Sequence, residues 1–284
     1  MHLVVCLKLV PDPLTVEASP FTGVIDPRRL LYRTNLADEG ALELALSLAG
    51  PTGRVSALTV GPPAADEVAR QALAVGASQA WRLWDASLPE PHPFATATLL
   101  AAAVRALPPA NVILCGARSS DRGSGTVPAL LAELLGLPVA TDVTALNLTG
   151  PTVQMQRRLD RGAREELVLD LPAVVGLEPG PLRLRQPALP QLLAARRTQI
   201  ELRTSADLGL RQLPAPASEQ RGLQAPRPRP RPIFAPASNL PAHERISQLL
   251  AAGVASKSGS IQSGPPEQLA ARLVAFLRER GFIP

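Results

Sequence analysis

The first part of the chain alternates short apolar runs with stretches whose apolar positions recur every three or four residues. A short apolar run predicts a buried strand, and the three-to-four spacing predicts a helix with one apolar face. This alternation predicts an α/β fold: a Rossmann-like, mostly parallel sheet with helices on both faces. Asn35 or Asp38 is expected to cap the first helix. The predicted strands are 3–10, 54–61, 79–84 and 111–116, and the predicted helices are 38–49, 66–74, 96–107 and 128–136.

The pattern changes after the fourth predicted helix. Residues 152–160 and 164–179 are rich in strand-forming residues, and the short segment 161–163 joins them. We interpret them as a hairpin whose second strand stops at Pro172, because proline donates no ladder hydrogen bond. The segment 187–201 follows as a proline-punctuated stretch with a basic end.

The composition shifts again beyond residue 200, toward arginine and proline, with the repeat PRPRPRP. Such a stretch is typical of an extended or disordered linker, and nucleic-acid binding through its arginines is the alternative. We therefore expect an α/β domain (1–200), a Pro/Arg-rich linker arm (201–241) and a C-terminal helical segment (242–284). In the last segment, helices are predicted at 242–253 and 265–281. The second helix has an apolar face suited to docking on a partner, made of Leu269, Leu273, Val274, Phe276 and Leu277.

Charge and hydropathy narrow the classes of function. The net charge is +5, and Lys8 and Lys257 are the two lysines among 29 basic residues. A basic surface favours anionic partners such as nucleotides or acidic protein surfaces. Aromatic residues make up 3% of the chain, too few for a platform that stacks single-stranded nucleic acid. No apolar run reaches the ~18 residues of a membrane-spanning helix, and the N-terminal run is too short for a signal peptide, so we expect a cytoplasmic protein.

The sequence carries no pattern of a metal or hydrolase site. Cys6 and Cys115 each lie inside an apolar run, where cysteine is most often a small buried hydrophobic residue. His2, His92 and His243 lack the spacing of metal ligands. No GxSxG motif is present. We therefore expect neither a protein metal site nor catalytic residues.

The loop 116–127 is the most informative stretch, since it is rich in glycine and small polar residues between a predicted strand and a predicted helix. Glycines let a backbone approach a ligand closely, and a helix N-terminus favours an anion. Asp121 is a candidate acceptor for a ribose hydroxyl, and Arg122 is a candidate phosphate contact. The loop matches neither the P-loop nor the dinucleotide fingerprint. Nucleotide binding and a structural turn both remain open at this point.

Four stretches resemble the beta subunit of electron-transfer flavoproteins. VVCLKLVPDP (4–13) is similar to the family's opening strand, and NLADEGALELAL (35–46) to its Asn-Pro-x-(Asp/Glu) helix. RRLDRGAREELVLDLPAVVG (157–176) is the most specific match, and LRLRQPALPQLLAARRTQIE (182–201) follows the family pattern. The resemblance spans roughly residues 1–210 and resumes at the terminal helix.

The resemblance implies a subunit of a heterodimeric electron carrier. In that family the alpha subunit holds most of the redox-active FAD. The beta subunit helps to enclose this flavin, binds AMP structurally and takes part in passing electrons from a dehydrogenase to an acceptor. By position, the implied AMP site consists of Cys6, Lys8, Asn35, Leu36, Ala37, Asp38, Val60, Gly116, Ala117, Arg118, Ser119, Ser120, Asp121, Arg122, Gly123, Ser124, Gly125, Thr126 and Val127.

The same resemblance implies two partner surfaces. Leu189, followed by Pro190, takes the place of an exposed leucine that inserts into a flavin dehydrogenase such as an acyl-CoA dehydrogenase. A buried core leucine is the alternative interpretation of Leu189. Arg157 and Arg158 fall on the side of the alpha subunit, and Arg158 stands where several members carry a glutamate, so this surface should differ.

Departures from the family pattern leave the nucleotide open. The loop keeps Asp121, but Gly123 replaces a second acid and Arg122 adds a positive charge, which makes it more attractive to phosphate. Some family members bifurcate electrons and hold a second FAD where others hold AMP. That alternative stands beside the AMP interpretation, and a nucleotide-binding module without a redox role is the third.

Overall fold

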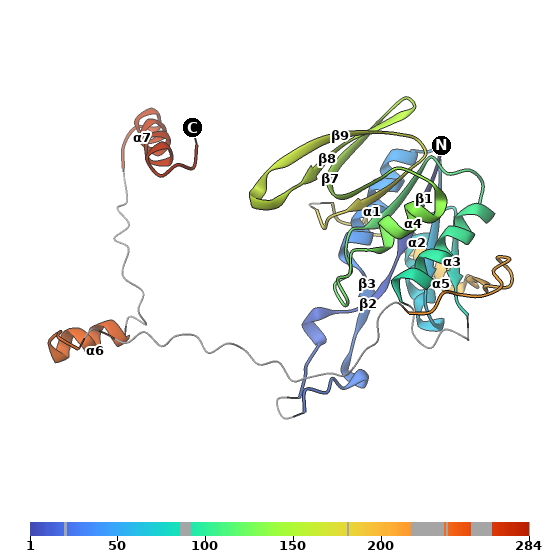
Figure 1. Cartoon of the computed structure of the whole chain (residues 1–284), viewed down its shortest axis with the longest axis horizontal. Helices are drawn as coiled ribbons and strands as arrows, with labels where there is room; N and C mark the ends of the chain where they lie inside the picture. Colours follow the sequence, from blue (N-terminus) through green and yellow to red (C-terminus); the bar gives the residue numbers. More distant parts are fainter. Residues whose placement is uncertain are drawn as a thin grey trace. The chain divides into compact units, whose positions relative to one another are not determined.

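A computed structural model describes residues 1–19, 22–85, 92–180, 182–216, 236, 238–250 and 263–283. The chain divides into two compact units, Met1–Ala225 and Pro226–Pro284, which are described separately. The first unit is built on a nine-stranded sheet with the strand order β11-β5-β4-β1-β6-β10-β7-β8-β9 (Figure 1). The strands from β11 to β7 run parallel, and β8 and β9 extend the sheet as antiparallel neighbours.

The elements of this unit have the following bounds. The parallel strands are β1 (His2–Leu7), β4 (Arg54–Val60), β5 (Gln79–Leu83), β6 (Val112–Gly116), β7 (Val139–Thr149), β10 (Ala173–Leu177) and β11 (Glu201–Arg203). The antiparallel strands are β8 (Thr152–Arg158) and β9 (Arg164–Asp170), and β2 (Leu9–Pro11) and β3 (Tyr32–Thr34) pair in a separate small sheet. The helices are α1 (Leu36–Ala49), α2 (Asp66–Val75), α3 (Pro93–Ala106), α4 (Val127–Leu135) and α5 (Leu189–Arg197), with 3-10 turns η1 (Pro13–Thr15), η2 (Pro27–Arg29), η3 (Pro63–Ala65) and η4 (Asp160–Gly162).

Helices cover both faces of the sheet, which confirms the predicted fold class. α1 and α2 supply Leu42 and Val68 to the core on one face. α3 and α4 supply Leu99 and Leu131 to the core on the other. β1 lies between the two layers and is buried at every position, which explains why its sequence shows an apolar run instead of alternation.

The helices and three of the four strands predicted for the first 137 residues are confirmed, with small shifts at their ends. The predicted strand 3–10 is instead divided at Lys8: β1 ends at Leu7, and Leu9–Pro11 form β2 in the separate small sheet. The end of α4 shows why the local sequence was sufficient there. Gly136 adopts a left-handed φ of +68° and its N–H returns to the carbonyls of Ala132 and Glu133. A glycine in this position ends a helix without the steric penalty that a side chain would bring.

The second half of this unit is more ordered than its sequence suggested. The predicted hairpin is present as β8 and β9, and Pro172 separates it from β10. β10 inserts between β6 and β7, and neither β7 nor β10 was assigned to the parallel sheet from the sequence. α5 forms within the proline-punctuated segment. β11 pairs with β5, so the sheet extends past the expected boundary at residue 200.

The second unit contains two described helices, α6 (Ala242–Leu250) and α7 (Pro266–Glu279). No residue of α7 is buried, and Leu273 and Phe276 of its apolar face are exposed. The PRPRPRP repeat of the expected linker arm, like residues 251–262, lies outside the described residues. None of the described helices is long and apolar enough to cross a membrane.

Candidate functional site

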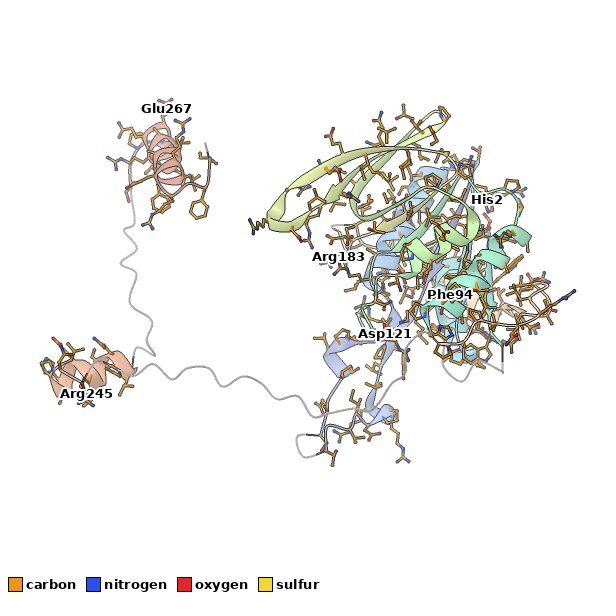
Figure 2. The ribbon with its side chains drawn as sticks, in the orientation of Figure 1. His2, Phe94, Asp121, Arg183, Arg245 and Glu267 are labelled. Carbon is orange, nitrogen blue, oxygen red and sulfur yellow. The ribbon has the colours of Figure 1, made fainter. Side chains whose placement is uncertain are left out.

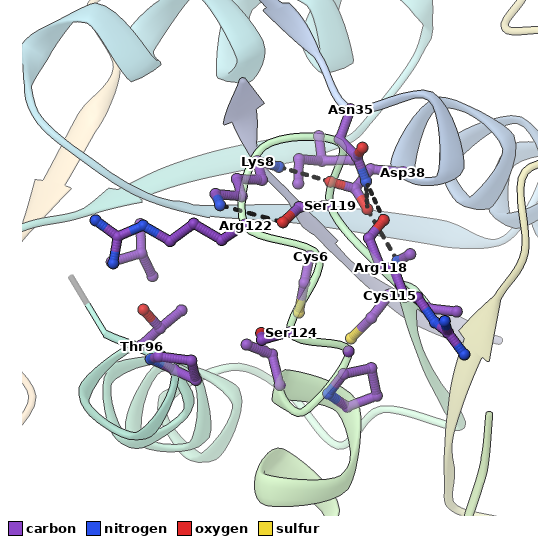
Figure 3. A pocket seen from close by; sticks show the side chains of 18 of the residues that line it. Cys6, Lys8, Asn35, Asp38, Thr96, Cys115, Arg118, Ser119, Arg122 and Ser124 are labelled. Carbon is purple, nitrogen blue, oxygen red and sulfur yellow. Dashed lines mark hydrogen bonds between the residues drawn. The ribbon is translucent and has the colours of Figure 1, made fainter. Parts of the chain in front are cut away.

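The order of the parallel strands reverses between β1 and β6: β4 and β5 lie on one side of β1, and β6 and β10 on the other. In open α/β sheets, ligands bind beyond the carboxyl ends of the strands at such a reversal. A pocket opens there, at the ends of β1, β4 and β6, and the loop 116–127 and the first turn of α3 close it (Figure 3). Its cavity volume is about 120 Å³, and the empty space continues through an open mouth into the solvent.

A buried carboxylate, that of Asp38, fixes the base of the pocket. Its Oδ2 accepts the backbone N–H of Lys8 (2.8 Å), and its Oδ1 accepts the backbone N–H of Gly116 (2.9 Å) and the Nδ2–H of Asn35 (3.1 Å). Burial raises the pKa of Asp38 to about 7, although the hydrogen bonds from Asn35, Lys8 and Gly116 act in the opposite direction. Asp38 therefore joins the ends of β1 and β6 to the first turn of α1.

The side chain of Asn35 holds the loop and does not cap α1. Asn35 occupies the N-cap position, but its side chain makes no capping hydrogen bond. Its Nδ2 donates to the carbonyl of Arg118 (3.0 Å), and its Oδ1 accepts the N–H of Ser120 (3.2 Å). Asn35 is thus the N-cap residue, as predicted, but the tertiary structure brings loop backbone groups within reach of its side chain, which holds them instead of the helix N-terminus; Asp38 lies inside the helix.

Lys8 closes the other side of the loop. Its Nζ lies 2.6 Å from both carboxylate oxygens of Asp121 and 3.3 Å from the Oγ of Ser119. Figure 2 labels Asp121 on this loop and Phe94 in the first turn of α3. Burial opposes ionisation of Asp121, but the hydrogen bonds from Lys8 and Ser119 outweigh it, so the pKa of this carboxyl is lowered. Lys8 therefore holds Asp121, the candidate ribose acceptor. Lys8 lines the pocket, whereas Asp121 does not.

Most of the residues predicted for a nucleotide site lie around this one pocket. The lining includes Cys6, Lys8, Asn35, Asp38, Val60, Gly116, Ala117, Arg118, Ser119, Arg122, Ser124, Gly125 and Val127. The remaining predicted residues, which do not line it, are Leu36, Ala37, Ser120, Asp121, Gly123 and Thr126.

Sequence reasoning missed six further lining residues: Leu7, Pro93, Thr96, Leu100, Cys115 and Pro128. Three of them belong to α3, which begins at Pro93 and not at Thr96 as predicted. Proline at the start of a helix is a common signal, and it would have located this turn.

The residues assigned to partner surfaces lie elsewhere. Leu189 is the first residue of α5 and is 66% exposed, which excludes the alternative of a buried core leucine. Pro190 is also exposed. The Nε of Arg157 lies 2.5 Å from Glu165, and the Nη2 of Arg158 lies 3.0 Å from Glu178, so both arginines have ion-pair partners within the chain.

The sequence model of the electron transfer flavoprotein domain matches residues 22–208 of this chain. The chain belongs to the electron transfer flavoprotein family. It is 31% identical over 218 residues to Protein FixA of Azorhizobium caulinodans, and the aligned residues cover 74% of this chain and 77% of FixA. It is 29% identical over 225 residues to the electron transfer flavoprotein subunit beta of Mycobacterium tuberculosis, covering 74% and 81% of the two chains. It is also 30% identical over 177 residues to subunit CarD of the caffeyl-CoA reductase-Etf complex of Acetobacterium woodii, covering 62% and 67%.

These relatives are beta-type proteins of the electron transfer flavoprotein family, and the resemblance seen in the sequence is confirmed. This chain is accordingly a beta-like electron-transfer subunit of that family. The family match spans every element from α1 to β11, and it includes the loop 116–127 and most of the pocket lining.

Proposed function

We propose that this chain is the beta subunit of a heterodimeric electron-transfer flavoprotein and that it binds AMP in the pocket between β1 and β6. The observation that carries the AMP assignment is the loop 116–127. The side chains of Asn35 and Lys8 hold this loop over a pocket at the reversal of the strand order. A structural turn alone would not need a pocket beneath it.

The lining supports a mononucleotide by its chemistry. Val60, Leu100 and Val127 provide apolar surface for a base. Lys8 and the hydroxyl of Ser124 provide groups that bind phosphate, and the N-terminus of α4 adds a partial positive charge of roughly half a unit. The same pocket therefore offers surfaces for both ends of AMP.

Gly125→Ala is expected to weaken AMP binding about tenfold or more, a loss of about 1.4 kcal/mol. Gly125 lines the pocket with φ +65°, and an added Cβ would lie 3.3 Å from Cγ of Arg118 and 3.4 Å from the carbonyl oxygen of Ala117. Gly123→Ala is the matched control, since Gly123 has φ +61° but does not line the pocket, and its Cβ would have 3.7 Å to the nearest atom. Calorimetric titration of the full chain with AMP measures both. Equal losses in the two variants would assign the effect to backbone strain and contradict the pocket assignment.

FAD is the second candidate for the same pocket, because Arg122 lines it and adds positive charge for a longer phosphate chain. The test is to purify the chain with its alpha subunit, denature the heterodimer and identify the released nucleotides by absorbance and mass. One FAD and one AMP support the proposed carrier. Two FAD molecules support a bifurcating subunit instead. One FAD with no second nucleotide contradicts both, and isolation without any alpha subunit or flavin favours a module without a redox role.

In the proposed heterodimer, the flavin held mainly by the alpha subunit accepts and releases the electrons. This chain contributes binding surfaces: the apolar face of α7 packs on the alpha subunit, and β8, with Arg157 and Arg158, faces it. The internal ion pairs of the two arginines support a role in shaping this surface. Arg158 remains 60% exposed beside Glu178, so it presents charge to a partner as well.

Leu189→Ala is expected to slow electron delivery from an acyl-CoA dehydrogenase about tenfold without loss of FAD. Exposed apolar side chains that fill a partner's pocket carry about 1–2 kcal/mol or more of binding free energy. Leu193→Ala, one turn further along α5 and 43% exposed, is the control and should have a smaller effect. Stopped-flow reduction of the flavin by the reduced dehydrogenase measures the rate. Unchanged kinetics in Leu189→Ala would contradict the docking role, and loss of FAD would show a structural one.

A further inference from the structure

Cys6 and Cys115 lie side by side at the base of the pocket. The two residues are direct partners in the register of the parallel strands β1 and β6. Both are free cysteines, both are buried, and both line the pocket. Figure 3 shows the two sulfur atoms projecting from neighbouring strands toward the same part of the pocket. Side chains of paired residues on neighbouring strands point to the same face of a sheet, so this arrangement follows from the register.

The spacing of the strands brings the two cysteines within reach of a covalent bond. Neighbouring strands lie about 4.8 Å apart, and the Cα atoms of disulfide-bonded cysteines lie about 4.4–6.8 Å apart. The thiol of Cys6 is the neighbour of the Cys115 thiol across the two strands. That neighbour and burial raise the pKa of Cys115, so its thiol keeps its proton at neutral pH. The pair is therefore stable as two thiols and reacts slowly unless an oxidant enters the pocket.

We propose that Cys6 and Cys115 form an oxidisable dithiol that becomes a cross-strand disulfide when the nucleotide pocket is empty, with a hydroperoxide as the oxidant. One thiol, as its thiolate, attacks the peroxide and becomes a sulfenic acid while the O–O bond breaks and water leaves after protonation. The second thiol attacks the sulfenic sulfur, the S–S bond forms and a second water leaves. Two thiols and one hydrogen peroxide thus give one disulfide and two waters.

Formation of this bond has a direct consequence for the loop. The S–S bond is about 2.05 Å long, so the two side chains, which line the pocket, must leave their present positions and change its base. Gly116 follows Cys115 directly, and Lys8 lies two residues after Cys6; their N–H groups are two of the donors to Asp38. We therefore expect the disulfide form to bind AMP more weakly. This coupling rests on the proposed function of the pocket, whereas the dithiol chemistry does not.

The test uses the full chain, stripped of nucleotide, with hydrogen peroxide as the probe. Intact mass and peptide mapping should show loss of two hydrogen atoms and a Cys6–Cys115 linkage, which dithiothreitol reverses. AMP at about 100 times its Kd should slow the reaction about 100-fold, because only the empty form reacts. Cys115→Ser is the control: it should give a sulfenic acid or a higher oxide on Cys6, without a linkage.

The outcomes separate the dithiol proposal from the proposal of nucleotide binding. Independent oxidation of the cysteines, or no reaction in the folded, stripped chain while the urea-unfolded chain reacts, would overturn the dithiol proposal. A disulfide that forms equally fast with and without AMP would support the dithiol and contradict nucleotide binding at this pocket. Formation of the disulfide with protection by AMP supports both.

Discussion

Gly116→Ala is expected to destabilise the α/β unit by about 3 kcal/mol or more and to abolish nucleotide binding. An added Cβ would overlap the Oδ1 of Asp38 and would lie 2.8 Å from the Cβ of Ala37 and 3.0 Å from the Nδ2 of Asn35. These atoms belong to the first turn of α1, which is buried between the sheet and the loop, so they have little room to move. Displacing the Asp38 carboxylate also leaves the backbone N–H groups of Lys8 and Gly116 without their acceptor.

Urea unfolding followed by tryptophan fluorescence measures this effect, because the two tryptophans of the chain, Trp81 and Trp84, lie in or next to β5 and report on this unit. Gly136→Ala is the matched control. Gly136 has the left-handed φ of +68°, but nothing lies within 4 Å of an added Cβ, so only backbone strain of about 1 kcal/mol is expected. If Gly116→Ala lowers the free energy of unfolding by no more than Gly136→Ala does, Asp38 does not pack closely against β6.

Asp38→Asn is expected to change the pH dependence of stability in a defined direction. The pKa of Asp38 is raised by burial from 3.8 to about 7, so the unfolded chain ionises this group at a lower pH than the folded chain does. The contribution of Asp38 is therefore fully present below about pH 4 and is lost as the pH rises toward 7. A shift of this size corresponds to a change on the order of 4 kcal/mol in the free energy of unfolding.

The measurement is the difference in free energy of unfolding between wild type and Asp38→Asn at several pH values from 4 to 8. At low pH the variant should be less stable, because the Asn Nδ2 cannot accept the N–H that Asp38 Oδ2 accepts from Lys8. This deficit should shrink as the pH rises, since Asn does not ionise. A deficit that grows with pH would show that the donors around Asp38, including nearby Lys8, outweigh burial.

Glu43→Gln provides a control of opposite sign. Arg185 donates hydrogen bonds to Glu43, the main cause of the lowered pKa of this carboxyl. The stabilisation by ionised Glu43 is therefore present above its unfolded pKa and is lost as the pH falls through the folded pKa. The difference between wild type and Glu43→Gln should grow as the pH rises from acid, unlike the difference for Asp38→Asn.

Much of the candidate site was predictable from the sequence because local patterns determine it. The apolar run that ends at Gly116, the glycines of the loop and Pro128 before an amphipathic stretch predicted β6, the loop and α4, and all three are present. The pairing of Lys8 with Asp121 was not predictable, since the two residues are 113 positions apart and no local pattern joins them. The same holds for the amide of Asn35, whose sequence context indicated a helix cap.

The sequence by itself determined the alternation of strands and helices, the turns at Gly116 and Gly136 and the family to which the chain belongs. These depend on the spacing of apolar residues and on conformations that glycine and proline favour, which act over a few residues. The tertiary structure alone decided the insertion of β10 between β6 and β7, the exposure of Leu189 and the meeting of Cys6 with Cys115. Each of these is a contact, or the lack of one, between distant segments, and it is set by how the whole sheet minimises its exposed apolar surface and satisfies its backbone hydrogen bonds.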